Sequence, residues 1–308
     1  MGLDKYVHTL GNYCQSRFGQ RLQKLTIDAG FDCPNRDGRL GVGGCTFCNV
    51  ASFSPNHASQ LGIAQQLTKG AAIKIRNAKR YLAYFQAYTS TYDEIQVLKA
   101  RYQEAIDTGL VDGLCIGTRP DCVSDEVLDL LSQYQAQGYE IWLELGLQTS
   151  NDKTLKRINR GHGFDAYQDA CKRAHQRGLK VCCHLILGLP GESSQDYQQS
   201  LSDILEVGVE GIKLHPLHVV DGSTMAKAWR AERLEPPSLQ HYASSAASLI
   251  RHTPKQVVYH RVTAYAKPPV LLAPDWAGDR WTGLNAVLEE LQQHGGQGSA
   301  LANQQLHF

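Results

Sequence analysis

The sequence predicts an α/β fold, a partial TIM-like (β/α)6 barrel with a C-terminal α/β extension. Three features of the chain predict it. Short apolar runs alternate with longer amphipathic stretches, reactive side chains follow most of these runs, and prolines become frequent after about residue 225. Strands that alternate with helices pair in parallel through right-handed crossovers. A doubly wound open sheet has the same alternation, and the pattern alone leaves that alternative open.

The expected strands are six apolar runs, which cover residues 22–28, 80–90, 113–118, 140–149, 179–190 and 211–220. The stretches between them have a helical pattern. The clearest begins with Ser124 as an N-cap, has acidic residues in its first turn and ends at Gly138. Similar helices, each ending near a glycine, are expected at 151–161, 164–178 and 193–208.

Chemically suggestive residues lie where the expected strands end. These positions include Thr89, Thr118, Gln148, Gly188 and His215. In α/β barrels the active site lies at the carboxyl ends of the strands. The six-strand count and this placement therefore favour a partial barrel with its site at that end.

The expected domain organisation follows the change in composition. A helix, a strand and a helix are expected after the barrel, at 238–252, 256–263 and 282–294. We read the chain as an N-terminal segment, a core barrel and an extension packed on the barrel, with boundaries at 1–20, 21–225 and 226–308.

Composition excludes several classes of protein. The 308 residues are 42% hydrophobic, and the formal net charge of +1 gives no overall attraction to nucleic acid or to membranes. No stretch approaches the roughly 20 apolar residues of a membrane span, and no signal peptide is evident. The nine cysteines are an odd number scattered along the chain. We therefore expect a cytoplasmic protein with no membrane partner, in which the clustered thiols bind metal or react.

The cysteine cluster is Cys33, Cys45 and Cys48, separated by eleven residues and then two in a glycine-rich segment. Three thiolates suit a [4Fe–4S] cluster with one iron left open, since such clusters normally take four cysteines. A structural zinc would need a fourth ligand, from Cys14 or His57. A redox pair would use the last two cysteines only. The spacing by itself leaves all three interpretations open.

The cysteine segment and the motifs AYTSTYDE, GTRPD, ELGLQTSND, RINRGH, HLILGLPGES and KLHPLHVV together resemble the radical S-adenosylmethionine (SAM) superfamily. The likeness is to its elongator-catalytic-subunit branch, and within it to the bacterial YhcC-type group. It extends over nearly the whole chain. The usual spacing in the superfamily is three residues and then two, so the long first gap is a departure that the elongator branch shares.

The resemblance implies a chemistry for the cysteines. Cys33, Cys45 and Cys48 would ligate three irons of a [4Fe–4S] cluster, and SAM would bind the fourth. The reduced cluster would cleave SAM to methionine and a 5′-deoxyadenosyl radical, which abstracts hydrogen from a substrate. A one-electron donor of the flavodoxin or ferredoxin type is implied as a partner. The resemblance identifies no catalytic residue, because the cofactors carry out the chemistry.

The resemblance also implies positions that contact the cofactors. Phe47 would cover the cluster, Gln148 and Arg160 would hold the ribose and carboxylate of SAM, and Gly188 would open the turn that holds the adenine. The other expected cofactor-binding residues are Thr89, Thr118, Glu144 and His184, with Tyr88, His215 and His218 nearby. Glu144 lies on the same face of its strand as Gln148, and a buried carboxylate there needs a partner. Arg119 either lines the site or simply pairs with Asp121.

The expected substrate is RNA, in particular tRNA, which the elongator resemblance suggests. A basic stretch supports this prediction, with Lys69, Lys74, Arg76, Lys79 and Arg80 and no acidic residue. A small metabolite or a protein side chain is the alternative substrate. The alternative function is a zinc-stabilised, non-catalytic barrel protein that acts as a binding module.

Overall fold

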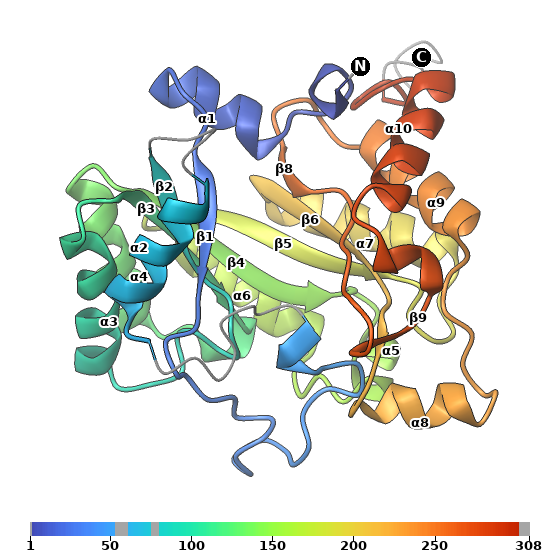
Figure 1. Ribbon diagram of the computed structural model, residues 1–308, viewed down its shortest axis with the longest axis horizontal. Helices are drawn as coiled ribbons and strands as arrows, with labels where there is room; N and C mark the ends of the chain where they lie inside the picture. Colours follow the sequence, from blue (N-terminus) through green and yellow to red (C-terminus); the bar gives the residue numbers. More distant parts are fainter. Residues whose placement is uncertain (1, 53–60, 75–79, 302–308) are drawn as a thin grey trace.

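The computed structural model describes residues 2–52, 61–74 and 80–301 (Figure 1). Its main feature is a curled sheet of seven parallel strands in the order β1-β2-β3-β4-β5-β6-β8. Their bounds are β1 Gln23–Ile27, β2 Tyr81–Phe85, β3 Val111–Thr118, β4 Glu140–Gln148, β5 Lys180–Leu187, β6 Gly211–Pro216 and β8 Val258–Arg261. The predicted α/β partial barrel is therefore confirmed.

Six helices follow strands β1 to β5 along the chain. The outer face of the sheet is covered by helices of this set (Figure 1). They are α2 Ile63–Lys74, α3 Ile95–Asp107, α4 Asp125–Ala136, α5 Asp152–Arg157, α6 Phe164–His175 and α7 Ser194–Val207. Alternate residues of β4, such as Leu143 and Leu145, belong to the large core that includes residues of these helices. Ser124 caps α4 as predicted, because its side chain accepts a hydrogen bond from the Val127 amide.

The inner face of the sheet forms a second, smaller core at the amino ends of the strands. Trp142, Cys115 and Cys182 pack there against Leu10 and Cys14 of α1, which spans Leu10–Phe18. Helix α1 lies at the opposite end of the barrel from the loop that follows β1 (Figure 1). The barrel is consequently plugged at one end, which leaves the carboxyl ends of the strands for a site.

The C-terminal extension contributes a strand to the barrel. Strand β8 pairs in parallel with β6, so the sheet has one strand more than the six predicted. This pairing covers the backbone edge that β6 would otherwise expose. The chain after β6 also contains α8 Thr224–Arg230, α9 Leu239–Arg251 and α10 Thr282–His294. Strand β9 Leu271–Ala273 of the extension pairs antiparallel with β7 Val219–Val220, which follows β6. Short 3-10 turns lie at Leu3–Lys5, Val50–Ser52, Pro120–Cys122 and Asp275–Gly278.

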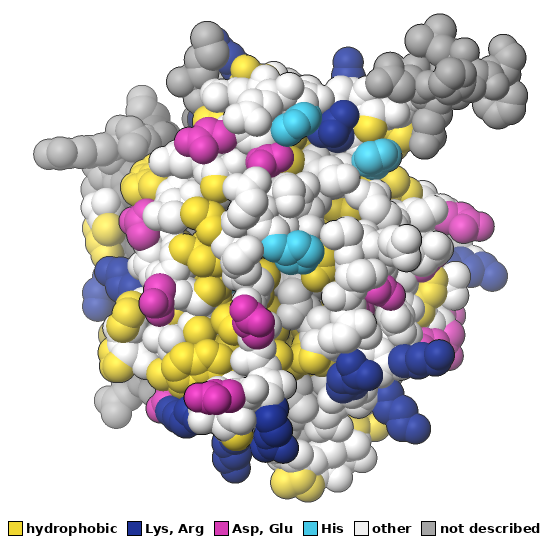
Figure 2. All heavy atoms as spheres, turned by 90° about the vertical axis from the view of Figure 1, so that its right-hand side faces the viewer, with side chains coloured by type: hydrophobic (Ala, Val, Ile, Leu, Met, Phe, Trp, Pro, Cys, Tyr) yellow, Lys and Arg dark blue, Asp and Glu magenta, His cyan; other side chains and the backbone are white. Residues whose placement is uncertain are grey.

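The surface has mixed charge. Figure 2 shows Lys and Arg interspersed with Asp and Glu over the face that it presents. Within the described ranges, no helix combines the length and the apolar character needed to cross a membrane. Of the predicted basic stretch, Lys69 is exposed on α2 and Arg80 pairs with Asp112. The Lys74 side chain, Arg76 and Lys79 lie outside the described residues.

Candidate active site

The candidate site is a cavity at the carboxyl ends of the strands, beneath the loop that follows β1. Its empty volume is about 1200 Å³, including space open to solvent. The structure brings almost all of the predicted site residues to its lining: Cys33, Cys45, Phe47, Cys48, Thr89, Thr118, Glu144, Gln148, Arg160 and His184. Tyr88, Arg119, His215 and His218 also line it.

The cysteine loop is held by backbone hydrogen bonds. The Gly44 amide donates to the Asn35 carbonyl at 2.7 Å, and the Cys48 amide donates to the Cys45 carbonyl at 3.0 Å. Gly44 has a φ of 80°, and a Cβ there would lie 2.9 Å from Nε of Arg36. Only glycine fits this turn without a shift of the arginine. The glycine at this position of the cysteine segment therefore has a steric basis.

The segment after α5 fastens the loop to the barrel. The Thr46 amide donates to the Ile158 carbonyl at 3.0 Å, and the Asn159 side chain donates to the Gly44 carbonyl at 2.9 Å. In return, Nδ2 of Asn35 donates to the Asn159 carbonyl at 2.5 Å. The two segments are more than a hundred residues apart in the chain, and they fold as one unit around the thiols.

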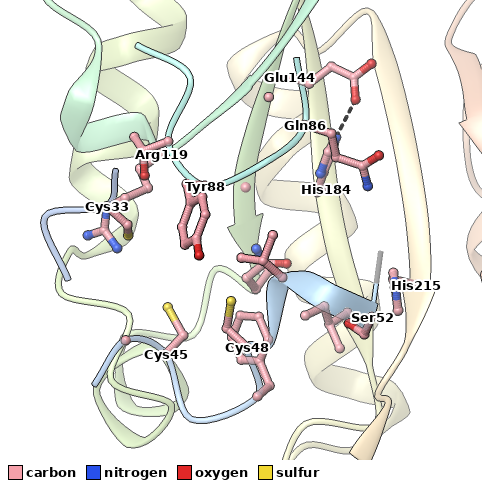
Figure 3. Close-up of a pocket in the computed structure, with 18 of the residues that line it drawn as sticks. Cys33, Cys45, Cys48, Ser52, Gln86, Tyr88, Arg119, Glu144, His184 and His215 are labelled. Atoms are coloured by element: carbon pink, nitrogen blue, oxygen red, sulfur yellow. Dashed lines mark hydrogen bonds and ion pairs between the residues drawn. The ribbon is translucent and has the colours of Figure 1, made fainter. Parts of the chain in front are cut away.

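The three thiols face a common space at the mouth of the cavity (Figure 3). The three sulfur atoms, all in the described part of the chain, do not all lie within 4.8 Å of one another. Thiolates on one tetrahedral zinc lie only about 3.8 Å apart, given the Zn–S bond length. The spread therefore fits a larger iron–sulfur cluster better than one ion. Cys14 is buried in the α1 plug and cannot supply a fourth ligand, and His57 lies outside the described residues.

Polar donors surround the sulfurs. Nδ2 of Asn35 and Nη1 of Arg160 each lie 3.5 Å from Sγ of Cys45. Arg36 donates to the Cys48 carbonyl at 3.0 Å. Burial and the neighbouring Cys45 raise the pKa of Cys48, and Arg36 opposes that rise. N–H groups directed at the sulfurs are the interactions that orient and tune a bound cluster.

Arg160 and Gln148 converge on one point of β4. Both Nε and Nη2 of the buried Arg160 donate to the Gly146 carbonyl, Nε at 3.1 Å. A Cβ on Gly146 would lie 2.9 Å from Nη2 of Arg160 and 3.0 Å from Nε2 of Gln148. The absent side chain at Gly146 thus lets both predicted SAM-contacting groups enter the cavity.

The neighbouring strand ends have other partners. Thr118 shares a 2.6 Å hydrogen bond with Thr91. Arg119 pairs with both oxygens of Asp121, at 3.0 and 2.8 Å, and also lines the cavity, so both interpretations of this residue hold. Its Nη1 is buried without a hydrogen-bond partner in the parts of the chain that are described.

Gly188 is the one predicted site residue that the cavity lining does not include. Its amide donates to the Tyr197 hydroxyl at 2.9 Å. It has a φ of 97°, and a Cβ there would lie 2.8 Å from the ring of Pro237. Close packing with the extension therefore explains a glycine here without a ligand.

A polar group that we call the floor cluster lies at the inner end of the cavity: Lys24, Tyr84, Glu144, His184, Lys213 and His260. Tyr84, Glu144, His184 and Lys213 line the cavity, and Lys24 and His260 contact Glu144 from beyond the lining. Figure 3 shows Glu144 far from Cys45 and Cys48. Glu144 is completely buried. It pairs with Lys24, with Lys213 at 3.0 Å and with Nε2 of His184 at 2.8 Å. We expected a partner for this buried carboxylate, and the structure shows that the partners are two lysines and a histidine. The two lysines were not identified from the sequence.

The charges in the floor cluster stabilise one another. Burial alone would raise the pKa of Glu144, but Lys213 and Lys24 hold it well below its usual value. Burial lowers the pKa of Lys213 to about 8, although Glu144 opposes that shift. Burial and the adjacent lysines also lower the pKa of His184 and His260 to about 3, so both rings are neutral at pH 7.

Glu144, Cys182 and His184 are close enough together to suggest a metal site. Two observations argue against one. Both carboxylate oxygens of Glu144 already accept hydrogen bonds from the lysines. Burial raises the pKa of the Cys182 thiol well above its usual value, so it is protonated and a poor ligand. We assign this group to the floor cluster.

Sequence reasoning did not identify Lys24, Lys213, His260 and Arg261 as site residues. The signal available was a lysine inside an apolar strand, at Lys24 in LQKLTID and Lys213 in GIKLHP. A lysine on the inner face of a barrel strand is rarely buried without a partner. Arg261 and His260 carried no such signal, because their strand was assigned to the extension.

Comparisons with known proteins agree with this geometry. The radical SAM superfamily matches residues 36–204, and the radical SAM C-terminal domain matches residues 209–293. Protein YhcC of Escherichia coli (strain K12) is 57% identical over 301 residues, which cover 98% of this chain and 97% of that protein. A tRNA uridine(34) acetyltransferase of Dehalococcoides mccartyi (strain CBDB1) is 33% identical over 129 residues, which cover 40% of this chain and 27% of that protein.

A solved structure supports the fold. An archaeal Elp3 of Methanocaldococcus infernus, lacking residues 1–46, superimposes with a TM-score of 0.62 at 16% sequence identity. The superposition covers 88% of this chain and 63% of that longer chain. With the match over residues 36–204, the evidence for the family is direct. The chain belongs to the radical SAM superfamily, whose members are enzymes that use a [4Fe–4S] cluster and SAM.

Proposed function

We propose that Cys33, Cys45 and Cys48 hold the [4Fe–4S] cluster, and that the cavity behind them binds SAM and the reacting group of the substrate. The observation that carries this proposal is the spread of three thiols at the mouth of a plugged barrel, in one cavity with Gln148 and Arg160. When bound, the reduced cluster supplies the electron that cleaves SAM into methionine and the hydrogen-abstracting 5′-deoxyadenosyl radical.

The residues of this chain bind, orient and shield these groups. The guanidinium of Arg160 is suited to pair with the SAM carboxylate in a bidentate manner, and Gln148 supplies an amide beside it. Phe47 is partly buried against the main core next to Cys48, and its ring would cover the cluster. The α1 plug packs apolar side chains against the inner end of the barrel. A radical reaction needs such seclusion.

The electron donor is proposed to be a flavodoxin or a ferredoxin that docks on the tip of the cysteine loop. The tip exposes two apolar side chains, Leu40 at 54% and Val42 at 83%, next to Arg39. Cys33 and Cys45 flank this tip, so a donor there would lie near the cluster. We also propose a cytoplasmic location, because none of the nine cysteines forms a disulfide in the described part of the chain.

The substrate is proposed to be tRNA. The support is the local similarity to a tRNA uridine(34) acetyltransferase, together with the basic residues at 69–80.

The test of the tRNA proposal is filter binding of bulk tRNA at two salt concentrations. A variant with Lys74, Arg76 and Lys79 changed to Gln should bind more weakly and with a shallower salt dependence. The control carries the same charge change on three exposed lysines, Lys99, Lys172 and Lys255. Equal binding by the two variants, or salt-independent binding by the wild type, argues for a small metabolite or a protein substrate.

The decisive experiment for the reaction is anaerobic reconstitution with iron and sulfide, followed by SAM and dithionite. Formation of 5′-deoxyadenosine supports the proposal. Stoichiometric zinc without iron uptake would instead support the alternative function, a zinc-stabilised barrel that acts as a binding module.

A further inference from the structure

The inner face of the barrel carries a row of residues in register across four strands. Gly146 of β4 pairs with His184 of β5, which pairs with Lys213 of β6, which pairs with Arg261 of β8. All four line the cavity. Strands in a sheet lie about 4.8 Å apart, so Arg261 lies roughly 14 Å along the sheet from Gly146, which anchors Arg160. Lys213 and Arg261 therefore form a basic pair on the far side of the cavity from Arg160.

The positive charge at this end of the cavity is not balanced. Lys24, Lys213 and Arg261 carry three positive charges against one negative charge on Glu144. The lysines share that carboxylate, whereas the side chain of Arg261 has no hydrogen bond or ion pair in the described part of the chain. Arg261 is half-buried, and its Nε is completely buried. Further down β4, Glu140 is already paired with Arg17 and Lys180.

The adjacent histidines are neutral, so they cannot balance the charge of Arg261. His215 and His218 are 4.5 Å apart between ring centroids and lie beside the basic pair. Burial holds the pKa of His215 well below its usual value, and lowers that of His218 to about 3. Nε2 of His218 is another buried atom without a hydrogen-bond partner among the described residues. Neutral rings next to an unpaired cation can donate hydrogen bonds to an anion.

This arrangement is unfavourable without a ligand. A buried charge is costly unless it is paired, and like charges directly opposite each other on neighbouring strands repel. Arginine cannot escape this cost by losing its proton, because its guanidinium stays protonated in proteins. The [4Fe–4S] cluster does not compensate it, because the thiols lie at the mouth, with Arg36 and Arg160 beside them. An anion that reaches the inner cavity would supply the missing partner.

We propose that Lys213 and Arg261 bind an oxyanion group of the substrate, a carboxylate or a phosphate, on the β6–β8 side of the barrel. The fork of Arg261 would take two of its oxygens, and Lys213 would supply a third donor next to Glu144. This inference deepens the proposed function, because the ligand is the molecule from which hydrogen is abstracted. It identifies what the reacting substrate must carry: an acidic group that positions it within reach of SAM.

The test is the thermal unfolding midpoint of the reconstituted protein, titrated with sodium acetate and, separately, with inorganic phosphate. Sodium chloride keeps the ionic strength constant. A ligand that binds the folded state raises the midpoint in a saturable manner. Arg261→Gln should weaken the apparent affinity about ten- to a hundredfold, the usual effect of losing one charged hydrogen-bond partner. Arg160→Gln tests whether the anions bind at the SAM carboxylate position instead. Arg177→Gln, which changes a surface arginine paired with Asp129, is the matched control.

Each outcome decides the question. Saturable stabilisation by acetate or by phosphate that survives in Arg160→Gln and Arg177→Gln but is lost in Arg261→Gln supports the proposal and identifies the class of anion. No saturable effect of either anion, or loss in Arg160→Gln alone, overturns it. Without added anion, Arg261→Gln should unfold at the wild-type temperature or above it, because it removes an unpaired and half-buried charge; a variant that fails to fold overturns the proposal. The titration uses no SAM, so a protein that binds anions but forms no 5′-deoxyadenosine would disprove the proposed reaction and leave this site in place.

Discussion

The two ends of the cavity are built in different ways. At the mouth, the polar side chains around the thiols donate to backbone carbonyls, as Arg36 does to Cys48 and Arg160 does to Gly146. In the floor cluster, side chains pair with one another around Glu144. Backbone anchors leave the functional groups at the mouth free for cofactors, whereas the groups of the floor cluster depend on each other. We therefore expect changes at the mouth to affect cofactors, and changes in the floor cluster to affect stability.

The largest effect is expected at the thiols. Changing Cys33, Cys45 or Cys48 to Ala should reduce the iron content of anaerobically reconstituted protein from about four per chain, the content of one cube, to almost none. The fold should persist, because the loop is tied by backbone hydrogen bonds. Iron analysis and circular dichroism measure the two effects.

Cys14→Ala is the matched control for these variants. Cys14 is completely buried in the α1 plug, at the other end of the barrel. It should keep the full iron content. A Cys14 variant that loses iron, or a Cys33 variant that keeps it, would contradict the assignment of the cluster to the mouth.

The next largest effect is expected from Glu144→Gln. Removing one member of a buried ion pair typically costs about 3–5 kcal/mol, because the remaining charge is left unpaired. Here two lysines lose their partner. Glu140→Gln is the control on the same strand: Glu140 is equally buried, but the side chain of its partner Arg17 is 54% exposed, so water can solvate it. Chemical denaturation should show the greater loss of unfolding free energy for Glu144→Gln. Equal losses would remove the distinction between the two sites.

The sequence was sufficient to predict one end of the cavity and not the other. The three cysteines and their glycines lie within sixteen residues, so a local pattern revealed them, and the structure brings them to one cavity; their role as ligands stays a prediction. The floor cluster is assembled from six strands, β1, β2, β4, β5, β6 and β8. Lys24 and His260 are 236 residues apart and meet only because the sheet curls. Spacing cannot encode such a contact.

The same limit applies to the fold. The six βα units were predicted because each strand and the helix after it are neighbours in the chain. Strand β8 was expected within residues 256–263 but assigned to the extension, because the frequent prolines after about residue 225 indicated that the barrel had ended. Its pairing with β6 depends on a long connection through α8 and α9. Arg261 could therefore not be placed in the cavity from the sequence.

At the mouth, Arg160→Gln should act on SAM and spare the cluster. Losing one charged hydrogen-bond partner costs about 1.5–3 kcal/mol, which corresponds to roughly ten- to a hundredfold in the dissociation constant of SAM. The control is Arg157→Gln, three residues earlier, whose guanidinium donates to the Pro190 carbonyl instead. Equilibrium binding of SAM and the iron content are the measurements. Unchanged SAM affinity in Arg160→Gln would exclude this residue from the SAM site.

The smallest effect is the pH dependence of the floor cluster. Burial and Lys24 lower the pKa of His260 to about 3 in the folded protein, from an ordinary value of 6.5. The unfolded chain therefore takes up a proton that folded His260 refuses, and stability is lost as the pH falls below about 6.5. Between pH 7.5 and pH 5.5 this histidine should lower the unfolding free energy of the wild type by about 1.4 kcal/mol, and the loss in His260→Gln should be smaller by that amount.

His175 provides a control of opposite sign, because its hydrogen bond to Glu210 raises its pKa. It stabilises the fold at lower pH, so His175→Gln should lose more stability than the wild type on acidification. Urea denaturation at the two pH values compares all three proteins, and a His260→Gln variant with the full pH dependence of the wild type would show that this ring is not held neutral by the floor cluster.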